Sequence, residues 1–177
     1  MTELLIRDAR AEDQAAIRDV TLLAYHEYAA VMQSNWERYR QNILATLADV
    51  KAAEQIVAEQ DGALVGTVLL FPPAGALAAP DGTSFTRAWP EIRLLGVAPA
   101  ARGQGVGAAL VRECLRRSRQ SGADAVTLHT TDMMAVAMSM YERMGFVRAP
   151  ELDFEPAPGF TIKGYRYRFA DGALTAL

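Results

Sequence analysis

The residues best suited to chemistry lie in the stretch from Glu91 to Gly107, which reads EIRLLGVAPAARGQGVG. Its first half is aliphatic and strand-length, and its closing glycines come directly before a helical pattern that begins near Ala108. Glycines let successive backbone N–H groups turn toward one point, and the start of a helix adds unpaired N–H groups and a positive dipole end. The stretch therefore predicts a site for a phosphate or pyrophosphate, although any turn from a strand into a helix can use glycine.

Two other phosphate-binding patterns compete for the same glycines. Gly103 to Ala108 formally matches the dinucleotide pattern G-x-G-x-x-[GA], and Asp124 follows at about the spacing of a ribose-binding acid. In a Rossmann unit, however, the first glycine directly ends the first strand and the acid ends the second. Here Ala98 to Arg102 intervene and Asp124 precedes its strand, which disfavours a nicotinamide cofactor. A nucleotide P-loop is disfavoured because no Gly-Lys-Ser/Thr follows the glycines.

Two motifs together carry a resemblance to a known family. The pattern RxxGxG from Arg102 to Gly107, preceded by LGVxP from Leu95 to Pro99, resembles the acyl-CoA signature of the GNAT superfamily of N-acetyltransferases. The run AMSMYERMGF from Ala137 to Phe146 is similar to the later helix of that family, where A-x-x-x-Y-E-x-x-G-F closes the cofactor site. Two motifs in this order are more specific than either alone. The resemblance is firm from Glu91 to Phe146 and only architectural elsewhere.

The resemblance implies acetyl-CoA (coenzyme A) as the cofactor. Backbone amides from Arg102 to Ala108 would hold its pyrophosphate, and Leu95 to Val97 would run along its pantetheine arm. Met134 departs from the family pattern, because many members have an asparagine there that hydrogen-bonds the cofactor. The polar contact would then fall to Thr130, Thr131, Asp132 or Ser139. The cofactor-binding residues that the resemblance implies are Leu95, Gly96, Val97, Arg102, Gly103, Gln104, Gly105, Val106, Gly107, Ala108, Ala137, Tyr141 and Arg143.

Three catalytic roles follow from the same resemblance. The Val97 N–H would stabilise negative charge on the thioester oxygen, and Tyr141 matches the usual general acid, which returns a proton to the departing thiolate. An ammonium group must lose a proton before it attacks, and Glu91 is the candidate base, directly or through a water. Strand alternation would put Glu91, Arg93, Leu95 and Val97 on one face. A solvated strand end with Glu91 paired to Arg93 is an open alternative.

The reaction implied is transfer of acetyl to an amine in a ternary complex, with no covalent enzyme intermediate. The acceptor would be a small-molecule or peptide amine, and the alternative function is a non-catalytic acyl-CoA-binding regulatory module. The first two helices and two long loops would shape the acceptor pocket, although an aromatic stripe at helical spacing is more often core. The polar and aromatic candidates for that pocket are Tyr25, His26, Glu27, Tyr28, Trp36 and Tyr39.

The pattern of elements predicts a mixed α/β fold in a single domain spanning residues 1–177. A Ser34 to Glu37 capping box should start the second helix, and residues 72–90 and 149–164 read as loops. With the resemblance, the expected architecture is GNAT-like, a largely antiparallel sheet of about seven strands flanked by about four helices. The strands are expected at 4–9, 55–59, 64–71, 91–97, 125–131, 146–148 and 165–169, and the helices from 13, from 36, at 108–122 and at 133–144.

Composition limits the cellular compartment and the classes of partner that we expect. The formal net charge of −3 argues against broad nucleic-acid binding, and no apolar run reaches the length of a membrane span. The single cysteine, Cys114, is expected in the core and fits a reducing cytoplasm. His26 and His129 show no metal-ligand spacing, so no metal is expected. We therefore expect a cytoplasmic protein without nucleic-acid or membrane partners, and a homodimer is left open.

Overall fold

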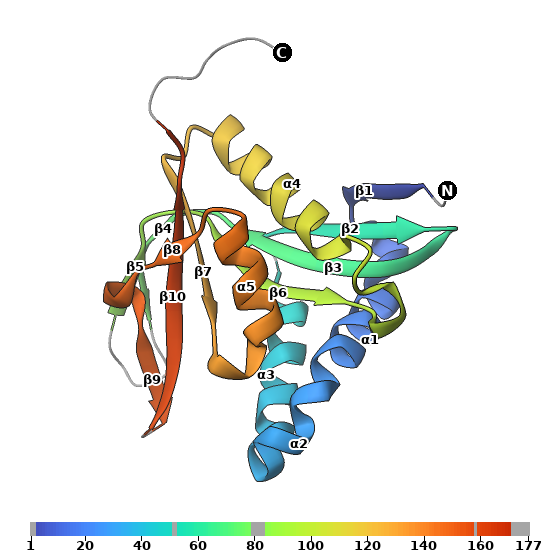
Figure 1. The fold of residues 1–177 in the computed structure, drawn as a ribbon, viewed down its shortest axis with the longest axis horizontal. Helices are drawn as coiled ribbons and strands as arrows, with labels where there is room; N and C mark the ends of the chain where they lie inside the picture. Colours follow the sequence, from blue (N-terminus) through green and yellow to red (C-terminus); the bar gives the residue numbers. More distant parts are fainter. Residues whose placement is uncertain (1–2, 51–52, 79–83, 158, 171–177) are drawn as a thin grey trace. The chain divides into compact units, whose positions relative to one another are not determined.

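The computed structural model describes residues 3–50, 53–78, 84–157 and 159–170, and these form a mixed α/β fold (Figure 1). Among the described residues, eight strands belong to a largely antiparallel sheet, two more form a separate hairpin, and helices flank the strands. This confirms the predicted fold class. The chain divides into two compact units, Met1–Pro72 with Ile92–Cys114 and Pro73–Glu91 with Leu115–Leu177. The single-domain assignment stays a prediction.

The first unit is built on antiparallel strands that follow the predicted pattern closely. β1 (Leu4–Asp8) pairs with β2 (Glu54–Gln60), and β2 pairs with β3 (Ala63–Phe71). Asp61 and Gly62 form the turn between β2 and β3 with φ angles of 52° and 78°. Positive φ at both central residues is typical of a type I′ turn, whose twist matches that of the two strands. The strands predicted at 55–59 and 64–71 are therefore confirmed, and they pair as a hairpin.

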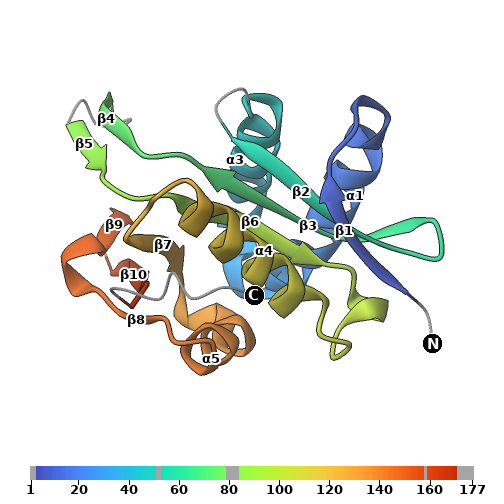
Figure 2. The same cartoon turned by 90° about the horizontal axis from the view of Figure 1, so that it is seen from above.

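Helices cover both faces of this part of the sheet (Figure 2). A Cβ at Gly96 of β6 (Glu91–Val97) would meet Ala24 of α1 (Gln14–Tyr25), and one at Gly66 of β3 would meet Val106 of α4 (Val106–Gln120). Backbone and helix thus approach closely on each side because glycine has no Cβ. The helices bury the apolar residues Ile17, Ala24, Ile43, Leu47, Leu110, Val111 and Cys114. The core position predicted for Cys114 is confirmed.

The start of the second long helix differs from the prediction. α3 (Trp36–Ala48) follows a short helix, α2 (Ala29–Met32), and a 3₁₀ turn at Gln33–Asn35, and no side chain caps it. The predicted Ser34 to Glu37 capping box is therefore wrong. Because the 3₁₀ turn runs directly into α3, the Trp36 N–H is satisfied by the Gln33 carbonyl. Glu37 instead forms an ion pair with Arg40, at 2.9 Å.

An ion cluster joins the first strand to the start of the first helix. The Arg7 guanidinium contacts the carboxylates of Asp13 and Glu59, each at 2.7 Å, and the three side chains are largely buried. Asp13 also accepts a hydrogen bond from the Arg10 N–H at 2.7 Å. The Arg7 hydrogen bond and then that of Arg10 lower the pKa of Asp13 to about 2, against burial, which acts to raise it.

Asp13→Asn is expected to lower the free energy of unfolding at pH 7 by about 1–3 kcal/mol, because it breaks a largely buried charge-assisted pair. The folded-state pKa of Asp13 lies below the unfolded one, so this stability is present above about pH 4 and is lost as pH falls toward 2. Urea unfolding at pH 7 and at pH 3 measures both effects. The control is Asp19→Asn, since Asp19 and its partner Arg18 are exposed. An equal loss in both variants would contradict this account.

The stretch predicted as a loop at 72–90 contains a hairpin in the second unit. β4 (Ala74–Ala78) pairs antiparallel with β5 (Ser84–Arg87), and residues 79–83 lie outside the described part of the chain. The loop prediction is therefore wrong for 74–78 and 84–87. The small residues of β4 show no alternation and β5 has only four residues, so neither gave a clear strand signal, and the prolines that suggested a loop at 72, 73 and 90 stand outside these strands.

The remaining strands of the second unit are organised by one long strand. β10 (Phe160–Arg168) pairs antiparallel with β7 (Ala125–Thr130), β8 (Val147–Arg148) and β9 (Phe154–Ala157). The helix of this unit after β7 is α5 (Ala135–Arg143), which a 3₁₀ turn at Asp132–Met134 precedes. The loop predicted at 149–164 is therefore wrong, because it contains β9 and the first residues of β10.

Helix length bears on membrane association. Within the described ranges, the structure contains no helix with both the length and the apolar composition that crossing a membrane requires.

Candidate functional site

The glycine-rich turn leads from β6 into α4 through a 3₁₀ turn at Pro99–Ala101. Gly103 and Gly105 have φ angles of +74° and +82°, and a Cβ on either would meet no atom within 4 Å. Glycine is therefore needed for the backbone conformation and not because the site is crowded. The hydrogen bond from the Ala109 N–H to the Gly105 carbonyl, at 2.9 Å, is of the i to i−4 kind found in an α-helix. The N–H groups of Val106 to Ala108 belong to the first turn before it, where an N–H has no i−4 carbonyl within the helix.

Arg102 anchors this turn through its side chain. The guanidinium donates to the Glu27 carboxylate at 2.7 Å, to the Ala24 carbonyl at 3.0 Å and to the Val97 carbonyl at 3.4 Å. These bonds tie the turn to the end of α1 and to the end of β6. The Arg102 guanidinium is therefore occupied by protein groups. The backbone N–H groups of the turn are then the part of the site that is suited to an anion. Gln104 is similarly folded back, since its amide donates to the Ala100 carbonyl at 3.1 Å.

Strand β6 carries an unusual backbone conformation at Leu94. Its φ is +48°, in the left-handed region that bulky residues rarely adopt. A left-handed residue reverses the local side-chain direction, so the strict alternation predicted from Glu91 to Val97 is interrupted. The assignment of Glu91, Arg93, Leu95 and Val97 to one face is therefore wrong. Strain of this kind in a non-glycine residue concentrates at functional sites, which draws attention to the end of β6.

Tyr141 lies on α5 with only 6% of its surface exposed. Its ring packs against Phe146 with centroids 5.8 Å apart, and Phe146 in turn packs against Tyr167 at 5.5 Å. The Phe146 N–H donates to the Tyr141 carbonyl at 3.0 Å, and Gly145 has a φ of +97°, so the YERMGF run closes the helix and returns to the sheet. Of the other candidates on α5, Ala137 is half-buried and Arg143 is exposed.

Glu91 at the start of β6 is held by residues from other strands of its unit. Its Oε1 lies 3.0 Å from Nδ1 of His129 on β7, and its Oε2 lies 3.9 Å from the Arg87 guanidinium on β5. Arg93, the partner considered from sequence, has its guanidinium over the Phe71 ring at 5.5 Å. His129 was not predicted to take part in chemistry. No local motif marks it, because its neighbours come from separate strands and turns.

A tightly packed segment after β8 fixes the other side of His129. Its Nε2 lies 3.0 Å from the Leu152 carbonyl, which belongs to a 3₁₀ turn at Pro150–Leu152. That turn is held against β10 because the Ala149 N–H donates to the Gly164 carbonyl at 3.0 Å and Arg148 pairs with Asp153 at 2.7 Å. The hydrogen bond from Arg148 lowers the pKa of Asp153, so the pair is charged at neutral pH.

Gly164→Ala is expected to cost about 1–3 kcal/mol of unfolding free energy, because its Cβ would lie 2.4 Å from Leu152 Cβ and 3.0 Å from the Ala149 carbonyl oxygen. The turn at Pro150–Leu152 would have to move away from β10. Thermal or urea unfolding measures the loss. Gly75→Ala is the matched control, since a Cβ there would meet nothing within 4 Å. Equal stability of the two variants would show that this close approach is not needed.

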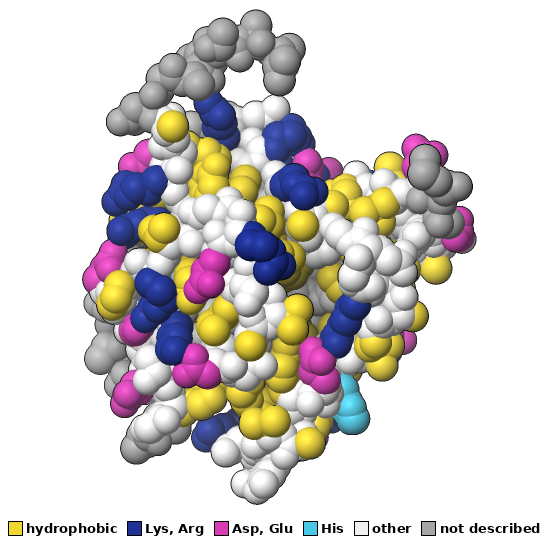
Figure 3. Space-filling model, viewed as in Figure 1, with side chains coloured by type: hydrophobic (Ala, Val, Ile, Leu, Met, Phe, Trp, Pro, Cys, Tyr) yellow, Lys and Arg dark blue, Asp and Glu magenta, His cyan; other side chains and the backbone are white. Residues whose placement is uncertain are grey.

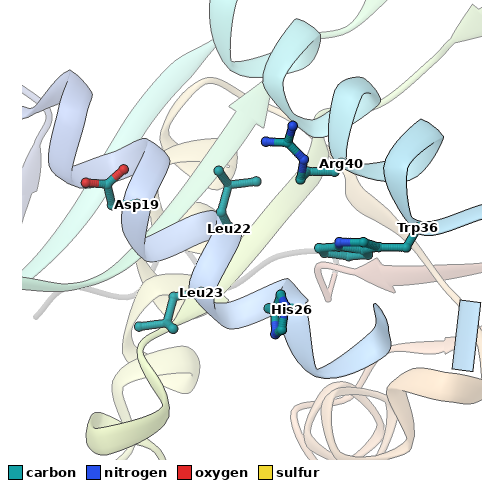
Figure 4. Close-up of a pocket in the computed structure, with 6 residues that line it drawn as sticks. All are labelled: Asp19, Leu22, Leu23, His26, Trp36 and Arg40. Atoms are coloured by element: carbon teal, nitrogen blue, oxygen red, sulfur yellow. The ribbon is translucent and has the colours of Figure 1, made fainter. Parts of the chain in front are cut away.

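The aromatic residues of the first two helices divide between core and surface. Tyr25 is buried and packs against Tyr28 and Tyr39, with ring centroids 6.1 Å from each. Burial raises the pKa of Tyr39 to about 12, and burial with Glu27 nearby does the same for Tyr28. His26 and Trp36 instead face each other at 5.7 Å and line a pocket of about 340 Å³ (Figure 4). The pocket is completed by Asp19, Leu22, Leu23 and Arg40.

Charged side chains are mixed on the surface. On the face shown in Figure 3, Lys and Arg lie among Asp and Glu. Three of the carboxylates form ion pairs with arginines: Glu27 with Arg102, Glu151 with Arg166 and Asp153 with Arg148. The expectation that the protein binds no nucleic acid stays a prediction.

Comparison with protein-family models matches residues 21–146 to the acetyltransferase (GNAT) family. The chain therefore belongs to the GNAT acetyltransferase family. The resemblance drawn from the RxxGxG and YERMGF motifs is confirmed.

Curated relatives carry acetyltransferase names. Mycothiol acetyltransferase of Cellulomonas flavigena is 36% identical over 123 residues, which cover 64% of this chain and 35% of that protein. N-acetyltransferase 8B of Homo sapiens is 35% identical over 98 residues, covering 55% of this chain and 40% of the human protein. The chain thus spans about a third of the length of the curated relatives it matches.

Solved structures share the fold over nearly the whole chain. The PaiA N-acetyltransferase of Thermoplasma acidophilum, solved with coenzyme A, has a TM-score of 0.71 at 16% identity and covers 94% of this chain and 99% of that one. A GNAT family acetyltransferase of Brucella melitensis, solved with acetyl-CoA, has a TM-score of 0.59 at 28% identity and covers 91% of this chain and 95% of that one. At 16% identity, the likeness to the Thermoplasma protein shows a shared fold and nothing further.

Proposed function

We propose that this chain is an N-acetyltransferase that uses acetyl-CoA as its acetyl donor. The observation that carries the proposal is the turn from Gly103 to Ala108, whose left-handed glycines and first-turn amides form the start of α4 in a member of the GNAT family. The coenzyme A and acetyl-CoA complexes of two structural neighbours support the same donor. We also propose that the protein is located in the cytoplasm.

The residues present fit an anionic cofactor at this turn. Positions 103 and 105 are open, since a Cβ on either would meet nothing, and the guanidinium of Arg102 is held away by Glu27. Backbone amides of Gly103 to Ala108 are therefore the groups we assign to the pyrophosphate. The Arg102 N–H, which the resemblance also implied, donates to the Pro99 carbonyl at 3.3 Å and is left out of this set. When bound, acetyl-CoA supplies an acetyl group activated as a thioester. Leu95, Gly96 and Val97 are assigned to its pantetheine arm, and Ala137, Tyr141 and Arg143 complete the proposed set.

Three groups of the chain are assigned to the transfer itself. The Val97 N–H donates a hydrogen bond to the carbonyl oxygen, where negative charge develops as the amine attacks. Glu91 removes the proton from the ammonium group, directly or through a water, so that the nitrogen can form its bond to the acetyl carbon. Tyr141 gives its hydroxyl proton to the sulfur as the carbon–sulfur bond breaks. The aromatic ring cluster that buries Tyr141 fixes the direction of its side chain.

The acceptor we propose is an amine on a small molecule or a peptide. The relatives named mycothiol acetyltransferase favour the small molecule, because the compound in that name is a small molecule. The test is acetyl-CoA-dependent release of thiol with a panel of small amines, amino acids and peptide N-termini. Turnover with at least one amine is expected. Tight binding of acetyl-CoA without turnover on any amine would favour the alternative, a regulatory module that binds acyl-CoA.

Gly105→Ala is expected to weaken acetyl-CoA binding by about tenfold or more, because a Cβ disfavours the left-handed backbone that sets the direction of the amides. Gly122→Ala is a close control. Gly122 follows the same helix, has a φ of +83° against +82° at Gly105, and is equally open. Both changes should cost similar stability, about 1 kcal/mol, whereas only Gly105→Ala should change the Kd measured by calorimetry. Equal Kd values in the two variants would remove the turn from the binding site.

A further inference from the structure

The ring of His129 is held at both of its nitrogens. Nε2 faces the Leu152 carbonyl at 3.0 Å, and a carbonyl can only accept, so Nε2 carries a proton. Nδ1 faces Oε1 of Glu91 at 3.0 Å, and two acceptors at that distance would repel each other. A second proton must therefore lie between Nδ1 and the carboxylate. The geometry is consistent only when His129 and Glu91 together hold that proton.

The surroundings indicate where the shared proton lies. Arg87 is 3.9 Å from the other Glu91 oxygen, and a cation there favours an ionised carboxylate and hence a protonated imidazole. Asp153 also interacts electrostatically with His129, and its own ion-pair partner is Arg148. Phe154 covers one edge of the imidazole ring, with centroids 5.4 Å apart. The Glu91 side chain is 12% exposed and that of His129 is 25% exposed, so the pair is shielded but reachable from solvent.

We propose that His129 is a positioning residue for Glu91, which it holds as an ionised, oriented carboxylate to take the proton of the acceptor ammonium. This rests on the proposed function, in which Glu91 is the base. In the step, the ammonium N–H bond breaks and a carboxyl O–H bond forms on Glu91, directly or through one water. His129 keeps both of its protons throughout. The Leu152 carbonyl supports it by fixing the ring plane, and the close approach at Gly164 holds that carbonyl in place.

Two substitutions separate the two hydrogen bonds of the ring. His129→Asn places an amide nitrogen near the position of Nδ1, which keeps a donor to Glu91 but no positive charge. His129→Gln reaches the position of Nε2, which keeps a donor to the Leu152 carbonyl and loses the one to Glu91. We expect His129→Gln to lower kcat about tenfold or more, with acetyl-CoA affinity within about twofold of the parent.

The pH profile distinguishes positioning from simple structural support. His129→Asn should recover most of kcat at high pH, while the acid limb of its rate profile moves to higher pH because the cation beside Glu91 is gone. Glu91→Gln combined with His129→Gln should be no slower than Glu91→Gln alone, because the two residues act as one unit. Additive losses in the double variant, or a His129→Gln profile identical to the parent, would overturn the proposal.

Nitrogen NMR of the histidines tests the pair without any turnover. The chain has two histidines, so the signal lost in His129→Asn assigns His129. The nitrogen chemical shifts should show Nδ1 and Nε2 of His129 both engaged in hydrogen bonds, and Glu91→Gln should change the shift of Nδ1 while that of Nε2 stays close to the parent value. An unchanged Nδ1 shift in Glu91→Gln would overturn the pairing. A Glu91-dependent Nδ1 shift in a protein that acetylates no amine would instead contradict the proposed function and, with it, the role of Glu91 as base.

Discussion

Tyr141→Phe is expected to lower kcat by about 10²- to 10⁴-fold, the range typical of losing a general acid, while acetyl-CoA affinity stays within about threefold. Phenylalanine keeps the ring that packs against Phe146 and removes only the hydroxyl proton needed by the departing sulfur. A tyrosine can serve here because the leaving thiolate is itself basic. The measurement is kcat with a saturating amine, together with Kd by calorimetry.

Tyr167→Phe is the control for this change. Tyr167 belongs to the same aromatic cluster, with its ring 5.5 Å from Phe146, but we assign it no role in transfer. Loss of its hydroxyl should leave kcat within about twofold. An unchanged rate in Tyr141→Phe, or equal losses in both variants, would remove Tyr141 from the acid role.

Glu91→Gln is expected to lower kcat/KM by about 10²-fold or more, with the greatest loss at lower pH, where the amine most needs a base. The amide cannot accept the ammonium proton, although it fills nearly the same space. At high pH a larger fraction of the amine is already neutral, so the rate should partly recover. Rate profiles between about pH 6 and pH 10 on one amine measure the effect.

Glu151→Gln provides the matched carboxylate control. Glu151 lies in the turn that approaches His129, but its carboxylate is exposed and paired with Arg166 at 2.7 Å. Its rate profile should coincide with that of the parent. If Glu91→Gln also gave the parent's profile, a water chain or another group would have to remove the proton.

Local patterns in the sequence were sufficient for much of the fold. The Asp61-Gly62 turn, the strand from Glu91 to Val97 and the helix that stops shortly before Gly122 all follow from short-range signals, namely turn residues and apolar periodicity. The glycine-rich turn was predicted for the same reason. Its left-handed glycines need no partner distant in sequence to adopt their conformation.

Features that depend on distant partners could not be predicted. Strand β4 is a run of small residues without alternation and β5 has only four residues, and the two form their hairpin by pairing with each other. The contact between Glu91 and His129 joins residues from two strands, β6 and β7. Leu152, which contacts the other ring nitrogen, lies in a turn that follows a third strand, β8. The left-handed Leu94 has no marker in the sequence, because bulky residues are disfavoured in that conformation.

Acetyl transfer to an amine is tested most simply by whether thiol release and acetylated amine appear together. The 177-residue chain would be incubated with isotope-labelled acetyl-CoA and the best amine of the panel, with thiol measured by absorbance and product by mass spectrometry. We expect one labelled acetyl group on the amine nitrogen for each thiol released, and loss of both signals in Tyr141→Phe. Thiol release without acetylated amine, or binding of acetyl-CoA with neither product, would contradict this expectation.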